Sequence, residues 1–121
     1  MKKIGLYFLA ILFLFLAACS AEKEEPIIST SPDGVNKIIV EATKESLSAP
    51  WNVKLILKPK NLEEQFVIFE LMAAGVTKDN VVFDWKDSNN GTVTFEHSDG
   101  AKRVFKFFIA DNRAQLQELG Q

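Results

Sequence analysis

Apolar and polar residues alternate with a period of two through most of the chain after residue 35. The clearest run is residues 51–58, in which Trp51, Val53, Leu55 and Leu57 alternate with Asn52, Lys54, Ile56 and Lys58. This period indicates a β-strand with one buried face, because successive side chains point to opposite sides of a strand. Residues 92–96 and 104–109 repeat it, and residues 35–43, 65–72 and 80–85 are rich in Val, Ile and Phe, which favour strands. The pattern predicts about six strands.

Turn sequences separate these runs. Ser31-Pro32-Asp33-Gly34 and Ser98-Asp99-Gly100 are typical of tight turns. Connections this short require neighbouring strands to pair antiparallel. We therefore predict a mainly β fold, in which a single small antiparallel sheet is curled into a sandwich or an open barrel.

Two smaller elements are predicted at the ends of this sheet. Ile27 and Ile28 are expected to add an edge strand. Asp111 as an N-cap and Gly120 as a stop predict a short C-terminal helix over residues 111–119, with a frayed tail over residues 114–119 as the alternative.

The beginning of the chain has a different pattern. Lys2 and Lys3 precede an apolar stretch over residues 4–18, and residues 20–26 are polar and charged. Fifteen apolar residues fall within the range of a secretory signal and below the roughly 17–25 that a membrane-spanning helix needs. We therefore interpret residues 1–18 as a cleaved signal peptide, with a membrane-spanning segment or an ordinary secretory signal as alternatives.

The end of this segment, Leu16-Ala17-Ala18-Cys19, resembles the lipobox of bacterial lipoproteins, and Cys19 is the only cysteine in the chain. The resemblance implies cleavage before Cys19, attachment of a diacylglyceryl group to its sulfur and anchoring of the mature protein in a membrane. Two acyl chains anchor a protein stably, whereas one does so only marginally. Residues 19–26 would be the lipidated cysteine with a flexible tether, and residues 27–121 a β-rich globular domain.

The resemblance also implies a location in the bacterial cell envelope. Ser20 stands where lipoproteins retained at the inner membrane carry aspartate. We therefore expect the periplasmic face of the outer membrane in a diderm host, and the outer face of the cell membrane in a monoderm host.

Charge and composition reduce the classes of partner that the chain is expected to bind. Without residues 1–18, 12 basic and 16 acidic residues remain, a formal charge of −4, which opposes binding to nucleic acid. One histidine, His97, and no free cysteine make a zinc site improbable, and residues 87–98 lack the ligand spacing of an EF-hand. We expect no metal and no cofactor.

No catalytic motif stands out in the mature chain. His97, Ser98 and Asp99 are adjacent, whereas the members of a nucleophilic triad come from separate elements. Asp84, Glu96 and Asp99 are the carboxylates that a small hydrolase would use. Because acidic residues that alternate with apolar ones usually face solvent, we predict that the protein is not an enzyme.

Aromatic residues exceed what one buried sheet face requires. Phe66 and Phe108 share strand faces with charged residues, and Trp85 lies in a further strand. Either both faces of the sheet are covered, or Phe66, Trp85 and Phe108 form a partner-binding surface. The function predicted is a noncatalytic, membrane-anchored β-domain that binds a protein or envelope component as an inhibitor, immunity protein or accessory. The alternatives are a structural accessory of an envelope complex and a small carboxylate-dependent hydrolase.

Overall fold

The computed structural model describes residues 22–120, and these residues form nine β-strands and no helix. The strands follow one another along the chain with short connections. In order they are β1 (Glu22–Lys23), β2 (Ile27–Thr30), β3 (Lys37–Lys44), β4 (Trp51–Lys58), β5 (Gln65–Leu71), β6 (Val81–Asp87), β7 (Asn90–Glu96), β8 (Lys102–Ile109) and β9 (Ala114–Glu118).

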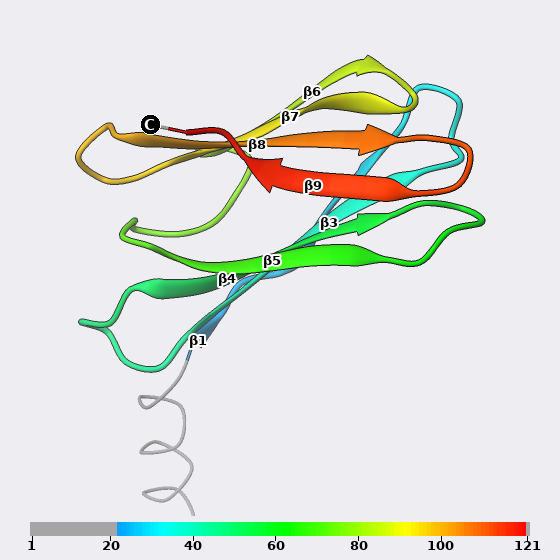
Figure 1. Ribbon diagram of the computed structural model, residues 1–121. Helices are drawn as coiled ribbons and strands as arrows, with labels where there is room; N and C mark the ends of the chain where they lie inside the picture. Colours follow the sequence, from blue (N-terminus) through cyan, green and yellow to red (C-terminus); the bar gives the residue numbers. More distant parts are fainter. Residues whose placement is uncertain (1–21, 121) are drawn as a thin grey trace, which may run out of the picture.

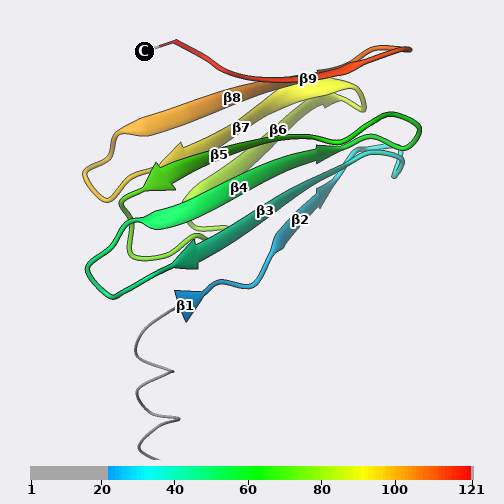
Figure 2. The ribbon, with the colours of Figure 1, turned by 60° about the horizontal axis from the view of Figure 1, so that its bottom comes forward.

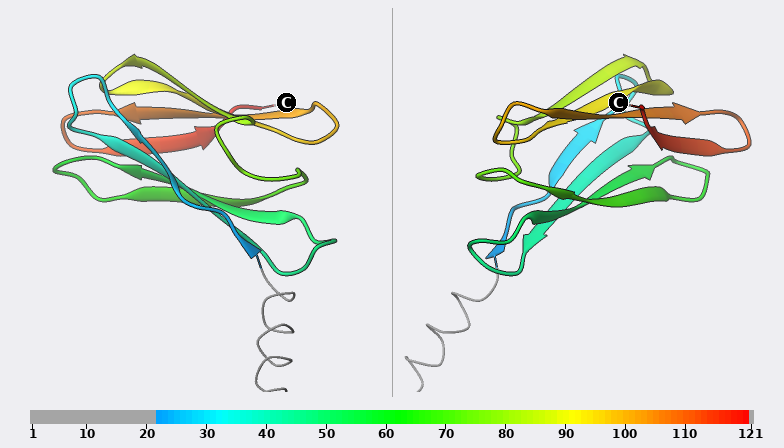
Figure 3. Two further views of the ribbon diagram at one scale, coloured as in Figure 1. Left: turned by 180° about the vertical axis from the view of Figure 1, so that it is seen from behind. Right: turned by 60° about the vertical axis from the view of Figure 1, so that its left-hand side comes forward.

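The strands form two antiparallel sheets that lie in two layers (Figures 1 and 3). In sheet A, β1 and β2 both pair with β3, which is followed by β4 and β5 (Figure 2). In sheet B the order is β6-β7-β8-β9. The prediction of a mainly β, antiparallel fold is confirmed, but the single curled sheet is corrected to two separate sheets. Residues 72–80 carry the chain from one sheet to the other.

The predicted C-terminal helix is wrong, because β9 occupies this part of the chain and pairs with β8. Ala114 is buried and Leu116 is half-buried, whereas Gln115 and Gln117 are exposed. This alternation suits a strand at the edge of a sheet with one face on the core. The backbone N–H and C=O groups of β8 pair with this segment and decide its conformation, whereas a nine-residue segment has little helix stability of its own.

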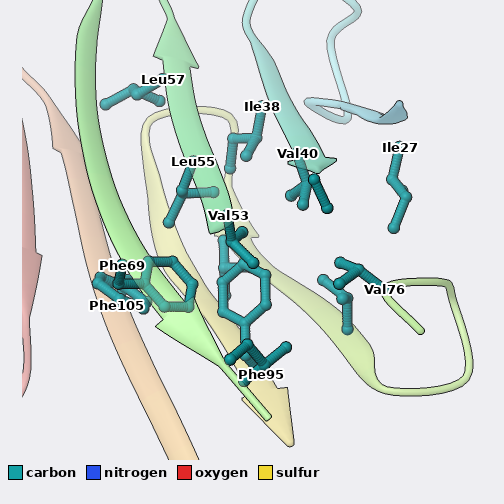
Figure 4. Packing of buried hydrophobic residues seen from close by; sticks show 14 of the residues in the cluster. Ile27, Ile38, Val40, Val53, Leu55, Leu57, Phe69, Val76, Phe95 and Phe105 are labelled. Atoms are coloured by element: carbon teal, nitrogen blue, oxygen red, sulfur yellow. The ribbon is translucent and has the colours of Figure 1, made fainter. Parts of the chain in front are cut away.

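The core lies between the two sheets and is rich in aromatic residues (Figure 4). Phe69 of sheet A lies with its ring centroid 4.8 Å from those of Phe95 and Phe105 of sheet B. Trp51, Val53, Leu55 and Leu57, the residues whose alternation predicted β4, are all buried. Period-two patterning therefore identified the inner face of sheet A correctly.

Gly91 is buried near the start of β7, where a side chain has no room. A Cβ atom built there would lie 2.1 Å from the carbonyl oxygen of Asp84 and 2.8 Å from Cζ of Phe107. The rings of Trp85 and Phe107, the register partners of Gly91, lie edge to face with centroids 4.8 Å apart. The glycine is needed because the Asp84 carbonyl and the Phe107 ring occupy the space that a Cβ atom would take.

A buried polar cluster joins the two sheets at the end opposite β1. Asn36, in the loop before β3, donates from Nδ2 to the carbonyl oxygen of Ser88 (2.8 Å), and its Oδ1 accepts from the backbone N–H of Lys60 (3.2 Å). Within the preceding turn, the Ser31 hydroxyl donates to Asp33 Oδ1 (2.6 Å). Its hydrogen bond is the largest cause that lowers the pKa of the Asp33 carboxyl, and the hydrogen bond from the N–H of Val35 is the second. In the turn predicted at residues 31–34, the N–H of Asp33 also donates to the Ser88 hydroxyl (3.1 Å), so this turn contacts the β6–β7 loop of sheet B.

Candidate binding surface

The outer face of sheet A carries a continuous row of apolar side chains. Ile28, Ile39, Ile56 and Phe66 are register partners on four neighbouring strands, β2, β3, β4 and β5 (Figure 2). Register partners in an antiparallel sheet project from the same face. Ile68 lies two residues beyond Phe66 and therefore on the same face. We call these five residues the apolar row.

The apolar row is exposed at its ends and covered at its centre. Ile28 is 59% exposed, Phe66 55% and Ile68 65%, whereas Ile56 between them is only 8% exposed. Single exposed apolar residues are common on protein surfaces, but contiguous apolar patches mark sites of interaction. The continuity across four strands is what distinguishes this surface.

Charged side chains border the apolar row. Lys37 and Lys58 are register partners on one side, and Lys58 Nζ lies 3.9 Å from Glu64 Oε1. On the other side, Glu41 pairs with Lys54, and Lys54 Nζ lies 4.6 Å from the centroid of the Phe66 ring. An apolar centre with a polar rim is the usual composition of a protein-binding surface.

The three aromatic residues predicted as a partner surface do not lie together. Phe66 belongs to the apolar row, whereas Phe108 projects from the outer face of sheet B and is 43% exposed. Trp85 is half-buried between the sheets, where its Nε1–H donates to the Ser29 hydroxyl (2.9 Å) and its ring packs on Phe107. Of the three, Phe66 alone contributes to the candidate surface.

Sequence reasoning missed three members of the apolar row, Ile28, Ile39 and Ile56, because their common face with Phe66 depends on the register of four strands. A local signal was nevertheless present. Ile27-Ile28, Ile38-Ile39 and Leu55-Ile56 are adjacent apolar pairs. In a strand, each such pair places one apolar residue on each face.

The candidate carboxylates do not converge. Asp84 is the register partner of Thr92, four residues from Glu96 along β7, which corresponds to about 13 Å. Asp99 lies in the β7–β8 turn, where its Oδ1 accepts from the N–H of Ala101 (2.9 Å). The structure therefore separates Asp84 from Glu96 and gives Asp99 a hydrogen bond within the turn.

His97 connects the two sheets. Its Nδ1 accepts from the N–H of Met72 (3.3 Å), and the neighbouring N–H of Ser98 donates to the Met72 carbonyl (2.7 Å). A neutral imidazole has a single acceptor nitrogen. Because the Met72 N–H occupies that nitrogen, His97 is not arranged to take a proton from Ser98, although both residues line an open hollow of about 450 Å³ with Asp79 and Glu96.

Cys19 and the lipobox residues Leu16, Ala17 and Ala18 lie outside residues 22–120, which the structure describes. Residues 22–26, predicted as part of the tether, lie on sheet A: β1 pairs with the end of β3, and the N–H of Glu24 donates to the carbonyl of Ala42 (3.1 Å). In the described part of the chain, no helix has the length and apolarity to cross a membrane. Within the same residues, no group of three or more His, Cys, Asp or Glu side chains is positioned to hold a metal ion.

Comparison of the chain with protein-family models, with curated proteins and with solved structures finds no match. The candidate function is therefore inferred from the sequence pattern and from the geometry of the two outer faces.

Proposed function

We propose that this protein is a lipid-anchored lipoprotein of the bacterial cell envelope whose β-sandwich binds a protein partner through the outer face of sheet A. The apolar row, which crosses four strands and is exposed at both ends, is the observation that carries the binding role. The lipobox-like sequence around Cys19 supports the anchor. An inhibitor, immunity or accessory role fits such a surface, because none of the three requires a catalytic group.

Energetics favour a binding role over a purely structural one. Apolar surface removed from water contributes about 25 cal/mol per Å². Binding of a partner that covers Phe66, Ile68 and Ile28 would be stabilised by this contribution. These exposed side chains are not needed for the stability of the fold. The bordering lysines and glutamates would then orient the partner rather than supply most of the affinity.

Site-specific photocrosslinking in the native envelope tests the binding face. A benzophenone amino acid replaces Phe66 in one chain and Phe108 in another, so that both probes replace an exposed phenylalanine on opposite faces. We expect a discrete crosslinked partner from position 66, its loss when Ile68→Asp is added to the same chain, and none from position 108. Equal crosslinking from both positions would contradict the assignment of the face.

The anchor is tested separately. In a Cys19→Ser variant no lipid can be attached to the sulfur, so we expect the protein to leave the membrane fraction. Tight membrane association that persists in this variant would contradict the lipoprotein assignment and leave the photocrosslinking result unaffected.

A further inference from the structure

The β3–β4 loop, residues 45–50, lies at the end of sheet A where the described chain begins. β1 starts at Glu22, which is the register partner of Lys44, the last residue of β3. The loop starts at the next residue, Glu45, and the figures show it beside β1 (Figures 1 and 2). Because β1 and β3 are antiparallel, the chain enters the sheet from the side on which this loop projects.

The number of residues between Cys19 and β1 limits the distance between a lipid on Cys19 and the β1 end of sheet A. Two residues lie between Cys19 and Glu22, and a fully extended chain covers about 10–11 Å over the three steps from one to the other. The interfacial and headgroup layer of a bilayer is itself roughly 5–8 Å thick on each side. A lipid on Cys19 would therefore hold the β1 end of the sandwich against the membrane surface.

Leu47 lies in this loop and is 73% exposed, more than any other large apolar side chain of the described residues. Its neighbours Ser46 and Ser48 are small and exposed, and their hydroxyls lie 3.5 Å apart. The backbone N–H of Ala49 donates to the carbonyl of Ser46 (3.2 Å), so the loop is closed by a tight turn. Leu47 is thus presented on a short hydrogen-bonded loop with no bulky side chain beside it to cover it.

We infer that Leu47 is a second membrane contact, which inserts into the interfacial region of the bilayer that holds the lipid of Cys19. The inference rests on the proposed lipid anchor. Near the loop, Glu22 and Glu45 are balanced by Lys23 and Lys44, so no net charge attracts the loop to anionic headgroups and the contact is apolar rather than electrostatic. With two contacts, the sandwich is oriented with the β1 end on the membrane and the opposite end away from it.

Fluorescence quenching by brominated lipids tests this contact. The lipidated protein is purified with Ser48→Cys, labelled with an environment-sensitive fluorophore and reconstituted into phosphatidylcholine–phosphatidylglycerol vesicles with or without bromine on the acyl chains. The thioether on Cys19 does not react with thiol reagents, so the parent protein serves as the unlabelled blank. The matched far-end probe is Asn61→Cys, which is exposed in the β4–β5 loop beyond the other end of the eight-residue strand β4, about 26 Å away.

We expect bromine to quench the Ser48 probe, the quenching to be lost when Leu47→Asp is added, and the Asn61 probe to be unaffected. An unchanged thermal unfolding temperature of the Leu47→Asp chain would show that its fold is intact. If that variant does not fold, Leu47→Ser is used in its place. Three results with a lipidated protein would overturn this inference alone. The Ser48 probe is not quenched by bromine, or it is quenched to the same extent in the Leu47→Asp chain. In the third, a bound protein shields the probe from water and bromine does not quench it. Absence of lipid on Cys19 in the mass spectrum overturns the anchor and this inference together.

Discussion

The outer faces of the two sheets differ, although their inner faces are built alike. Across sheet A, the central outer row is Ile28, Ile39, Ile56 and Phe66. The corresponding central row of sheet B is Asp84, Thr92, Lys106 and Gln117. Sheet B also exposes apolar side chains, but Thr94 separates Val82 from Val104, and Phe108 lies beside Asn90 and Gln115.

The difference shows which apolar residues the fold requires. Both sheets bury alternate residues against the shared core, and sheet B does so while its other face stays largely polar. The core therefore does not require the exposed members of the apolar row, Ile28, Phe66 and Ile68, whereas Ile56 is buried. Because exposed apolar strands favour unwanted association, a row of this kind is best explained by a partner that covers it.

The largest expected effect contrasts the two faces within strand β5. Phe69 on the inner face packs on Phe95 and Phe105, and the guanidinium of Arg103 lies 4.6 Å from its ring. We expect Phe69→Ala to lower the free energy of unfolding by about 3–5 kcal/mol, because it leaves a cavity between the sheets. Urea unfolding of the chain without residues 1–18 measures this, and a loss below about 1 kcal/mol would show that the inner face is less well packed than the structure indicates.

A second substitution asks whether sheet B depends on its strand glycine. Gly91→Ala brings a Cβ atom into contact with the Asp84 carbonyl and the Phe107 ring, so either β6 or the ring must move. We expect a loss of about 1–3 kcal/mol in urea unfolding, the usual cost of overpacking. Gly120→Ala is the matched control, because nothing lies within 4 Å of its added Cβ, and it should change stability by less than about 0.5 kcal/mol. Equal effects of the two substitutions would contradict the steric argument.

The comparison of the faces also shows how far the sequence leads. Alternation identified the inner residues of β4, because burial of one face is a local property of a strand. The presence of two sheets was not predictable from alternation. Residues 72–80 carry no sequence signal that distinguishes a connection within one sheet from a connection between two sheets. The apolar row depends on the register of four strands, so Phe66 was recognised from its own strand while Ile28, Ile39 and Ile56 were not.

The C-terminal segment shows the limit of local helix signals. Asp111 and Gly120 have the residue types of a helix start and stop, but the N–H of Ala110 donates to the carbonyl of Arg113 (2.8 Å) and closes a turn. This turn returns the chain along β8. Long-range pairing thus outweighs a weak local preference.

A third substitution compares the exposed phenylalanines of the two sheets. Phe66→Thr and Phe108→Thr each keep a residue that favours strands. We expect Phe66→Thr to cost up to about 1 kcal/mol, because it removes the contact with Lys54 Nζ, and Phe108→Thr to cost less. Urea unfolding of both variants measures this, and a loss near that of Phe69→Ala would mean that Phe66 is a structural residue and would remove the main reason to regard the apolar row as a binding surface.

The smallest expected effect concerns the rim where sheet B meets β5 of sheet A. Arg103 on β8 makes two 2.7 Å hydrogen bonds with the carboxylate of Glu118 on β9, and its Nη1 also donates to the Glu70 carbonyl of β5 (3.3 Å). The hydrogen bonds from Arg103 lower the pKa of Glu118 below its ordinary value of 4.5. A carboxyl whose pKa is lower in the folded state stabilises the fold above its unfolded pKa, and this contribution is lost as the pH falls through the folded pKa.

We therefore expect Glu118→Gln to lower the free energy of unfolding at pH 7 by no more than about 1 kcal/mol, since both side chains are partly exposed and solvent screens the pair. The difference between parent and variant should shrink as the pH is lowered from 6 towards 3, because the Glu118 carboxyl of the unfolded chain takes up a proton before the paired carboxyl of the folded chain does. Urea unfolding at pH 7, 5 and 3 measures this. In an Arg103→Gln background, Glu118→Gln should have little effect at any of these pH values, because the guanidinium that lowers the pKa is absent. A difference that persists at pH 3, or in that background, would show that Glu118 acts through packing on β9, and that the contact between sheet B and β5 depends on shape rather than on charge.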